Sequence, residues 1–196
     1  MQNHEGMALY RKYLRVAALV VGIVSPAAAP SLSAQGGGQA RRSSVAPPPP
    51  AAPAPAALIE PARSMLRHLV GRWRVEVRFA GNFDGEPDAS GTRDIEALFD
   101  DLRLQWTEAL DSLRVKSQGM IGFDSRTGGF YSTSVDSAGP GAQLLTGTLD
   151  LAEPLITFSP AAGTAGASFA LRMVDQDHFI WSPLDRGWRA VLTRQP

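Results

Sequence analysis

Apolar and polar residues alternate with a period of two through most of the C-terminal part of the chain. In the first such run, residues 73–79, Trp73, Val75, Val77 and Phe79 fall on one face and charged side chains fall on the other. This arrangement is typical of a half-buried β-strand. Turn residues divide the later runs, and we expect further strands at 93–99, 102–110, 119–124, 130–136, 143–151, 155–159, 167–174, 178–182 and 188–194, the one at 119–124 beginning as early as Val115. We expect a loop at 82–91 and a turn at Asp100 and Asp101.

The spacing of these runs predicts an all-β fold. About ten short strands follow one another in roughly 130 residues, and no second helical pattern separates them. A chain of this kind folds as an antiparallel barrel or as a sandwich. One short helix is expected before the first strand, over residues 61–70, because Pro61 suits a first helical turn, Glu60 lies at the positive end of the dipole and Gly71 ends the pattern.

The clearest hairpin lies at residues 119–137. Two runs rich in β-branched and aromatic residues flank a loop at 125–129 whose residues tolerate positive φ. Asp124, Asp136 and Asp150 each follow a strand run. We expect these aspartates to cap their own turns through hydrogen bonds to the backbone, rather than to act as acids or bases.

The N-terminal segment predicts export. Three basic residues precede the uncharged run 16–24, which is followed by small residues up to Ala34. The run is shorter than the roughly 20 residues needed to cross a bilayer, so we predict a secretory signal peptide at 1–34, with an uncleaved anchor as the alternative. The mature protein is then secreted or periplasmic, without stable membrane insertion.

Residues 35–57 are rich in Gly, Ser, Ala and Pro. Such a segment cannot bury enough apolar surface to offset the entropy of ordering, which predicts a disordered linker. A docking motif for a proline-reading partner is the alternative. The folded domain is expected at 58–196.

Composition excludes several classes of function. The chain has 19 basic and 19 acidic residues, so its formal net charge is zero and it lacks the basic character of a nucleic-acid-binding domain. It contains no cysteine, which excludes disulfides, thiolate metal sites and thiol catalysis. Nothing in the pattern specifies an oligomeric state.

Five short motifs occur in order, at 69–73, 119–124, 134–137, 147–148 and 192–194. Together they resemble a bacterial family of secreted, lipocalin-like domains of unknown function, whose members typically read L-x-G-x-W, G-x-x-G-Y-D, W-x-D-S, E-G-T and Y-T-R. The resemblance covers about residues 66 to 196. It implies an antiparallel, up-and-down, lipocalin-like barrel of about ten strands, with the short helix covering one end.

Three positions depart from the family pattern. Phe123 replaces a tyrosine, Ser134 stands where a tryptophan is expected, and Leu192 replaces the tyrosine of the last motif. If interior aromatic residues hold a ligand in the family, the cavity of this chain is lined differently. A ligand therefore cannot be transferred by analogy.

Trp73 and Arg194 lie in the first and the last strand. These two strands become neighbours when an up-and-down barrel closes. We therefore expect the guanidinium to stack on the indole, a contact worth about 0.5–2 kcal/mol.

The sequence contains no catalytic signature. Gly-x-Ser-x-Gly, His-Glu-x-x-His and phosphate-loop motifs are absent. His68 and His178 are the only histidines of the domain, and a metal site needs three or four ligands. We therefore predict that the protein is not an enzyme and uses no metal or cofactor.

A second group of residues is a candidate ligand site. Glu108 interrupts an otherwise apolar strand face, so an arginine across the sheet or a ligand must satisfy its carboxylate. Trp106, Trp181 and Trp188 could line a cavity or form core. Together with Ser134 these residues make up the predicted ligand set.

These observations favour a non-catalytic protein that binds a small, largely apolar molecule. The alternative is a filled barrel on its Ala/Pro spacer, acting as an envelope-associated interaction module without a small ligand. A haem-binding barrel of the nitrobindin kind is disfavoured, because the last strand carries no histidine to serve as an axial ligand.

Overall fold

The computed structural model describes residues 54–139 and 141–196. The predicted signal peptide and residues 35–53 of the predicted linker lie outside the described residues. A short 3-10 helix η1 (Pro55–Leu58) begins the described chain. It is followed by α2 (Ile59–Leu69), β1 (Gly71–Phe79), β2 (Ala89–Leu98), β3 (Asp100–Leu110), β4 (Val115–Asp124), β5 (Gly129–Asp136), β6 (Gln143–Asp150), β7 (Leu155–Pro160), β8 (Phe169–Met173), β9 (His178–Pro183) and β10 (Trp188–Arg194).

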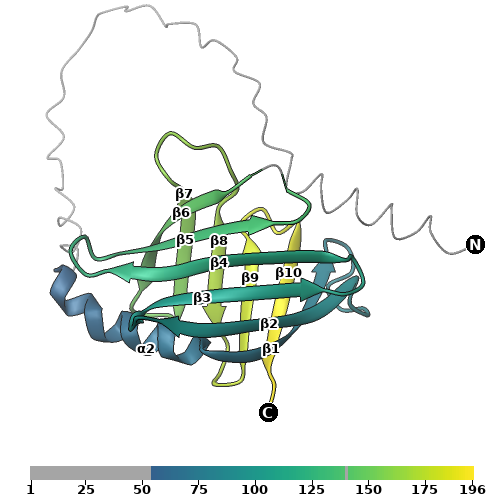
Figure 1. Ribbon diagram of the computed structural model, residues 1–196, viewed down its shortest axis with the longest axis horizontal. Helices are drawn as coiled ribbons and strands as arrows, with labels where there is room; N and C mark the ends of the chain where they lie inside the picture. The colour runs from purple at the N-terminus through teal and green to yellow at the C-terminus, as the bar shows by residue number, and fades with distance from the viewer. Residues whose placement is uncertain (1–53, 140) are drawn as a thin grey trace, which may run out of the picture.

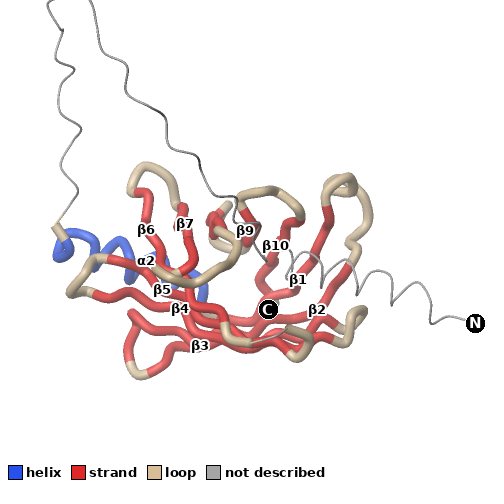
Figure 2. The backbone as a smooth tube through the Cα atoms, turned by 90° about the horizontal axis from the view of Figure 1, so that it is seen from above, coloured by secondary structure: helices blue, strands red, loops and turns tan. Residues whose placement is uncertain are grey.

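The strands form one closed antiparallel barrel, which confirms the predicted all-β fold. Each strand pairs with its neighbours in sequence, and β1 pairs with β10 to close the ring. Strands β2–β5 cross the front of the molecule, and strands of the C-terminal half run behind them at a steep angle (Figure 1). Figure 2 shows the same barrel from above, with α2 beside one end.

Side chains on the inner face fill much of the barrel. Trp73, Phe123, Phe158 and Phe179 are fully buried, and their rings account for much of this core. Helix α2 contributes Ala62, Met65, Leu66 and Leu69 from its apolar face, so it covers the end of the barrel as predicted. Ion pairs from Arg63 and Arg67 to Asp101 fix the helix to the start of β3 and hold the pKa of that carboxyl below its usual range.

Arg194 and Trp73 join the last strand to the first. The two residues are register partners, and the guanidinium carbon lies 4.3 Å from the indole centroid, so the predicted stack is present. Arg194 also donates from Nη1 to the carbonyl of Val70 and from Nη2 to that of His68, both at 2.8 Å. The indole Nε1 of Trp73 donates to the carbonyl of Leu69, also at 2.8 Å. We call this set of contacts the closure clamp.

Gly71 makes room for the closure clamp. Its φ of 137° is one that L side chains rarely adopt, and a Cβ there would lie 2.6 Å from Nη1 of Arg194. The L-x-G-x-W motif therefore has a physical role: Leu69 supplies a carbonyl, Gly71 supplies space, and Trp73 supplies the ring.

Three glycines of the barrel are covered by an aromatic residue on the neighbouring strand. In each case a Cβ would lie within 2.7 Å of the aromatic side chain. The register pairs are Gly119 with Trp106, Gly122 with Tyr131, and Gly147 with Phe158. Gly119 and Gly122 are three residues apart and so face opposite sides of β4. The G-x-x-G motif thus allows one ring to pack inside the barrel and another outside it.

Turn chemistry follows the sequence prediction at three aspartates. Asp124 accepts from the backbone N–H of Arg126 at 2.9 Å, and this bond lowers the pKa of its carboxyl. Asp136 and Asp150 each accept from the backbone N–H two residues later at 2.8 Å. Their predicted role as turn caps is confirmed.

The boundaries of β2 differ most from the prediction. The strand begins at Ala89, inside the expected loop, because Gly91 has no Cβ to collide with the carbonyl of Ala109, which would lie only 1.8 Å away. At its other end the chain reverses at Phe99, not at residues 100 and 101. Phe99 has a positive φ of 65° and is 93% exposed.

Replacing Trp73 by alanine should lower the free energy of unfolding by about 3–5 kcal/mol, because the change removes a fully buried ring together with its stack and hydrogen bond. Chemical denaturation of the full chain measures this loss. Trp73→Phe keeps an aromatic ring but not the indole N–H donor, so its free energy of unfolding should fall by less. A loss for Trp73→Ala of the size seen at ordinary surface sites would contradict the role of the closure clamp.

Replacing Phe99 by glycine should raise the free energy of unfolding by about 0.5–1 kcal/mol. The substitution relieves a left-handed conformation that costs about 1–2 kcal/mol, against a smaller entropic penalty for glycine. Phe99→Ala is the matched control, since it removes the same exposed ring but keeps the Cβ, and should be nearly neutral. Thermal unfolding compares the two variants. A destabilised glycine variant would show that the exposed ring makes contacts needed for folding.

Candidate functional site

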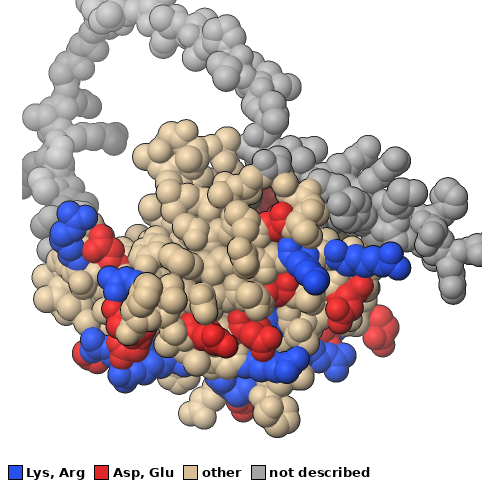
Figure 3. Space-filling view, viewed as in Figure 1, with Lys and Arg blue, Asp and Glu red and all other residues tan. Residues whose placement is uncertain are grey.

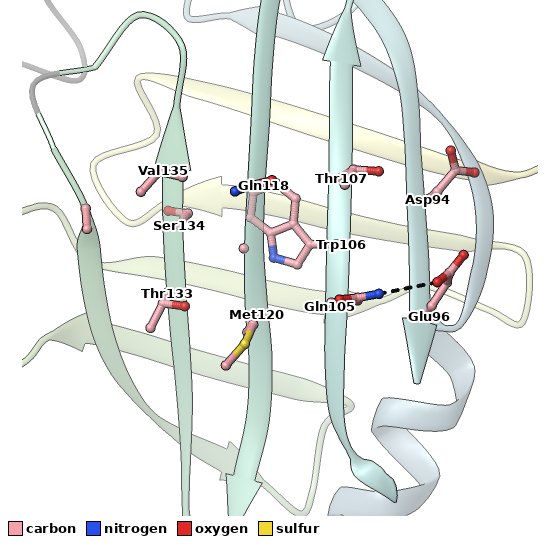
Figure 4. A pocket seen from close by; sticks show the side chains of 12 residues that line it. Asp94, Glu96, Gln105, Trp106, Thr107, Gln118, Met120, Thr133, Ser134 and Val135 are labelled. Atoms are coloured by element: carbon pink, nitrogen blue, oxygen red, sulfur yellow. Dashed lines mark hydrogen bonds between the residues drawn. The ribbon is translucent and has the colours of Figure 1, made fainter. Parts of the chain in front are cut away.

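A hollow of about 480 Å³ lies on the outer surface of strands β2–β5 (Figure 4). We call it the outer hollow. Its lining residues are Asp94, Glu96, Gln105, Trp106, Thr107, Gln118, Gly119, Met120, Thr133, Ser134, Val135 and Ala142. Most of these side chains alternate with buried residues such as Ile95 and Ile121, which places them on the solvent side of the barrel wall.

The rim and walls of the outer hollow are polar. Amide and hydroxyl side chains come from β3, β4 and β5, and two carboxylates come from β2 (Figure 4). Gln105 donates from Nε2 to Glu96 at 3.4 Å. Within the described part of the chain, the side chains of Thr107, Gln118 and Thr133 make no hydrogen bond, so their donors and acceptors are available to a ligand.

Charge on this face is uneven. Asp94 lies 3.6 Å from Nε of Arg72, and both side chains are about half exposed, so this pair is weakly held. None of the residues that line the hollow is Lys or Arg. Figure 3 shows acidic and basic side chains interleaved along the lower part of this face and a mainly uncharged area above them.

The floor of the outer hollow is a cross-strand row of three inward-facing residues. Trp106, Gly119 and Ser134 are register partners on β3, β4 and β5. The indole packs where a side chain on Gly119 would lie, since a Cβ there would be 2.6 Å from the ring. Two of the predicted ligand residues, Trp106 and Ser134, therefore lie on either side of Gly119 beneath the hollow.

Glu108 has an arginine partner. Arg93 faces it across β2 and β3, donating from Nε at 2.9 Å and approaching the same carboxylate oxygen with Nη2 at 2.6 Å. Ser117 donates to the other oxygen at 3.5 Å. Both charged side chains are nearly buried, and the guanidinium lies 4.6 Å from the centroid of Trp106. The carboxylate of Glu108 thus holds Arg93 against Trp106.

Trp181 and Trp188 belong to a separate aromatic group. Phe169 stacks on Trp181 with centroids 5.5 Å apart and planes at 15°, and it contacts Trp188 at 6.2 Å. Phe158 approaches Trp181 at 5.4 Å. We call these four residues the inner aromatic cluster. Both tryptophans face the barrel interior and yet are partly exposed. Among the described residues, no ring contact joins the cluster to Trp106.

The predicted ligand set therefore divides into two groups. Trp106, Glu108 and Ser134 lie together on the wall formed by β3 to β5, whereas Trp181 and Trp188 meet on β9 and β10. The polar residues of the outer hollow were not predicted from the sequence. The sequence shows Gln and Thr at outward positions of β3, β4 and β5, but these are ordinary residues for exposed strand positions, so they gave no signal of a site.

Other features of the described chain are isolated. His68 contacts the carbonyl of Ser64 at 2.7 Å, and His178 contacts Asp175 at 2.8 Å. In residues 54–139 and 141–196, no three His, Asp or Glu side chains gather as a metal site would require. No helix in the same residues is long and apolar enough to cross a bilayer. A second open hollow of about 440 Å³ lies beside Leu149 and Leu155.

The chain was compared with known proteins. A search of curated proteins finds no match. A family model described as "Protein of unknown function (DUF1579)" matches residues 59–181, which include α2, the first eight strands and the part of β9 up to Trp181. The match covers more than half of the chain and most of the motifs noted in the sequence, although the last strand lies outside it. The chain therefore belongs to the DUF1579 family of proteins of unknown function.

Proposed function

We propose that this domain is a non-catalytic binding module, and that it holds its partner molecule in the outer hollow of strands β2–β5. The volume of the hollow, about 480 Å³, falls within the roughly 300–1,000 Å³ of small-molecule sites, as does that of the second hollow, so the polar groups that converge on this one carry the proposal. Unpaired amide and hydroxyl groups from three strands surround this space. Such groups fix the orientation of a ligand.

The filled barrel interior favours a surface site over a deep interior one. Four large aromatic residues are fully buried there, and both hollows described above open to solvent on the barrel wall. We further propose that the barrel is lipocalin-like and that the protein is secreted or periplasmic. The basic-then-apolar start of the chain supports export.

Binding without catalysis fits the chemistry of the outer hollow. Its carboxylates, on Asp94 and Glu96, are exposed to water. A general acid at neutral pH needs its carboxyl desolvated or placed beside a like charge. No histidine and no arginine lies among the lining residues to complete an acid–base pair.

The inner aromatic cluster supports a second candidate function, the binding of a small apolar molecule inside the barrel. Trp181 and Trp188 are inward-facing but partly exposed. Inward-facing side chains reach solvent only where the barrel wall or its mouth is open. An apolar ligand could stack on the exposed edges of these rings.

A fragment screen by two-dimensional ¹H–¹⁵N NMR on the full chain tests both candidates. A mixture of polar and apolar fragments should shift backbone amides of the outer hollow, for example those of Gln118 and Thr133. Shifts confined to the indole signals of Trp181 and Trp188 would replace the proposal with the second candidate. Spectra that no fragment changes would overturn both.

Replacing Glu108 by glutamine should lower the free energy of unfolding by about 3 kcal/mol, because Arg93 would keep its charge in a nearly buried position without a counter-ion. Urea denaturation measures the loss. The double variant Arg93→Met with Glu108→Leu should recover most of it, since it removes both charges. If Glu108→Gln left the stability unchanged, the Arg93–Glu108 ion pair would not stabilise the fold. Glu108 would then again be a candidate for contact with a ligand.

A further inference from the structure

We infer that the outer hollow recognises an uncharged polyhydroxylated chain, that is, a neutral oligosaccharide segment. This inference rests on the proposed function and adds the chemical class of the ligand. It is drawn from the donors and acceptors of the lining, from its charge and from its shape.

The lining matches the hydrogen-bonding character of sugar hydroxyls. A hydroxyl group is both donor and acceptor, so an array of hydroxyls needs both kinds of partner. Gln118 offers an amide with a donor and an acceptor end, Thr107 and Thr133 offer hydroxyls, and the carboxylates of Asp94 and Glu96 accept only. These groups would satisfy a run of hydroxyls without any ion pair.

Other classes of ligand would use fewer of the lining groups. An anionic ligand would meet two carboxylates and no cation in the hollow. A cationic ligand could pair with the two carboxylates, whose contacts with Arg72 and Gln105 are long, but it would leave the remaining amide and hydroxyl groups of the lining without partners. A purely apolar ligand would bury the free amide and hydroxyl groups without hydrogen bonds, which costs about 1–3 kcal/mol for each group.

The shape of the outer hollow suits a chain better than a single compact molecule. Its polar residues come from four adjacent strands (Figure 4). Neighbouring strands lie about 4.8 Å apart, so these side chains spread over roughly 14 Å across the sheet. Met120 and Val135 add apolar contacts on the same face, and Val135 is 41% exposed. The C–H faces of sugar rings could pack against these two side chains.

Isothermal titration calorimetry on the full chain tests the inference. The probes are a neutral glucose hexasaccharide and a neutral N-acetylglucosamine hexasaccharide, with an oligogalacturonide as the anionic comparison and spermine as the cationic one. We expect at least one neutral hexasaccharide to bind at least tenfold more tightly than either charged probe. The same sugar should shift the NMR signals of the outer hollow.

Matched variants locate the binding. Gln118→Ala should weaken the binding of the neutral sugar by about three- to tenfold, as expected for the loss of one or two hydrogen bonds. Gln176→Ala removes the same side chain from an exposed turn outside the hollow and should leave binding unchanged. Equal circular dichroism spectra and melting temperatures for the two variants would show that neither effect arises from unfolding.

The outcomes separate the two levels of the proposal. If fragments bind the outer hollow but neither hexasaccharide does, the ligand class is wrong and the binding module stands. If spermine or the oligogalacturonide binds more tightly than the sugars, the ligand is charged and this inference fails. If no fragment and no sugar binds the hollow, both the inference and the proposed function fail. Sugar binding that Gln118→Ala leaves unchanged would place the sugar elsewhere on the molecule.

Discussion

Arg194 donates hydrogen bonds to carbonyl groups at the C-terminal end of helix α2, which lies far from it in the chain. The last carbonyls of any α-helix lack partners within the helix and carry its negative dipole end. Here, the carbonyls of His68 and Val70 accept from Arg194, and that of Leu69 accepts from the indole of Trp73. One guanidinium thereby caps α2, stacks on β1 and fixes the end of β10. The helix, the closed sheet and the core between them all depend on this contact.

Glycines determine where large aromatic side chains can pack against the barrel wall. Gly119 lets the indole of Trp106 pack against β4, and Arg93, which is ion-paired with Glu108, packs on that indole. A bulky residue on the inner side is thus accommodated at the point where the outer surface is hollow. The floor of the outer hollow and the buried ion pair are therefore parts of one arrangement, in which a change inside the barrel would reach the outer surface.

Much of the fold could be predicted from the sequence, because burial of one face of each strand makes apolar and polar residues alternate with a period of two. Trp73, Arg194 and the aspartate turn caps were predictable, since each follows from strand order or from local turn chemistry. The reversal at Phe99 was not, because the neighbouring Asp100 and Asp101 carry a stronger turn signal than a phenylalanine does. The outer hollow was not predicted either. The alternation marks these Gln and Thr as outward-facing, but only the register of four strands brings them together.

The closure clamp also constrains the order of events during folding. Arg194 and the carbonyl it caps are separated by 124 residues. Contacts of such long range slow folding, because the entropy of closing the loop is lost before the contact can form. A nascent chain can pair β1 with β2 early, but α2 remains uncapped and β1 keeps an open edge until the last strand arrives. The domain is therefore expected to stay incompletely folded until β10 has been synthesised, so a ribosome-bound chain that stops before β10 should lack the closed barrel.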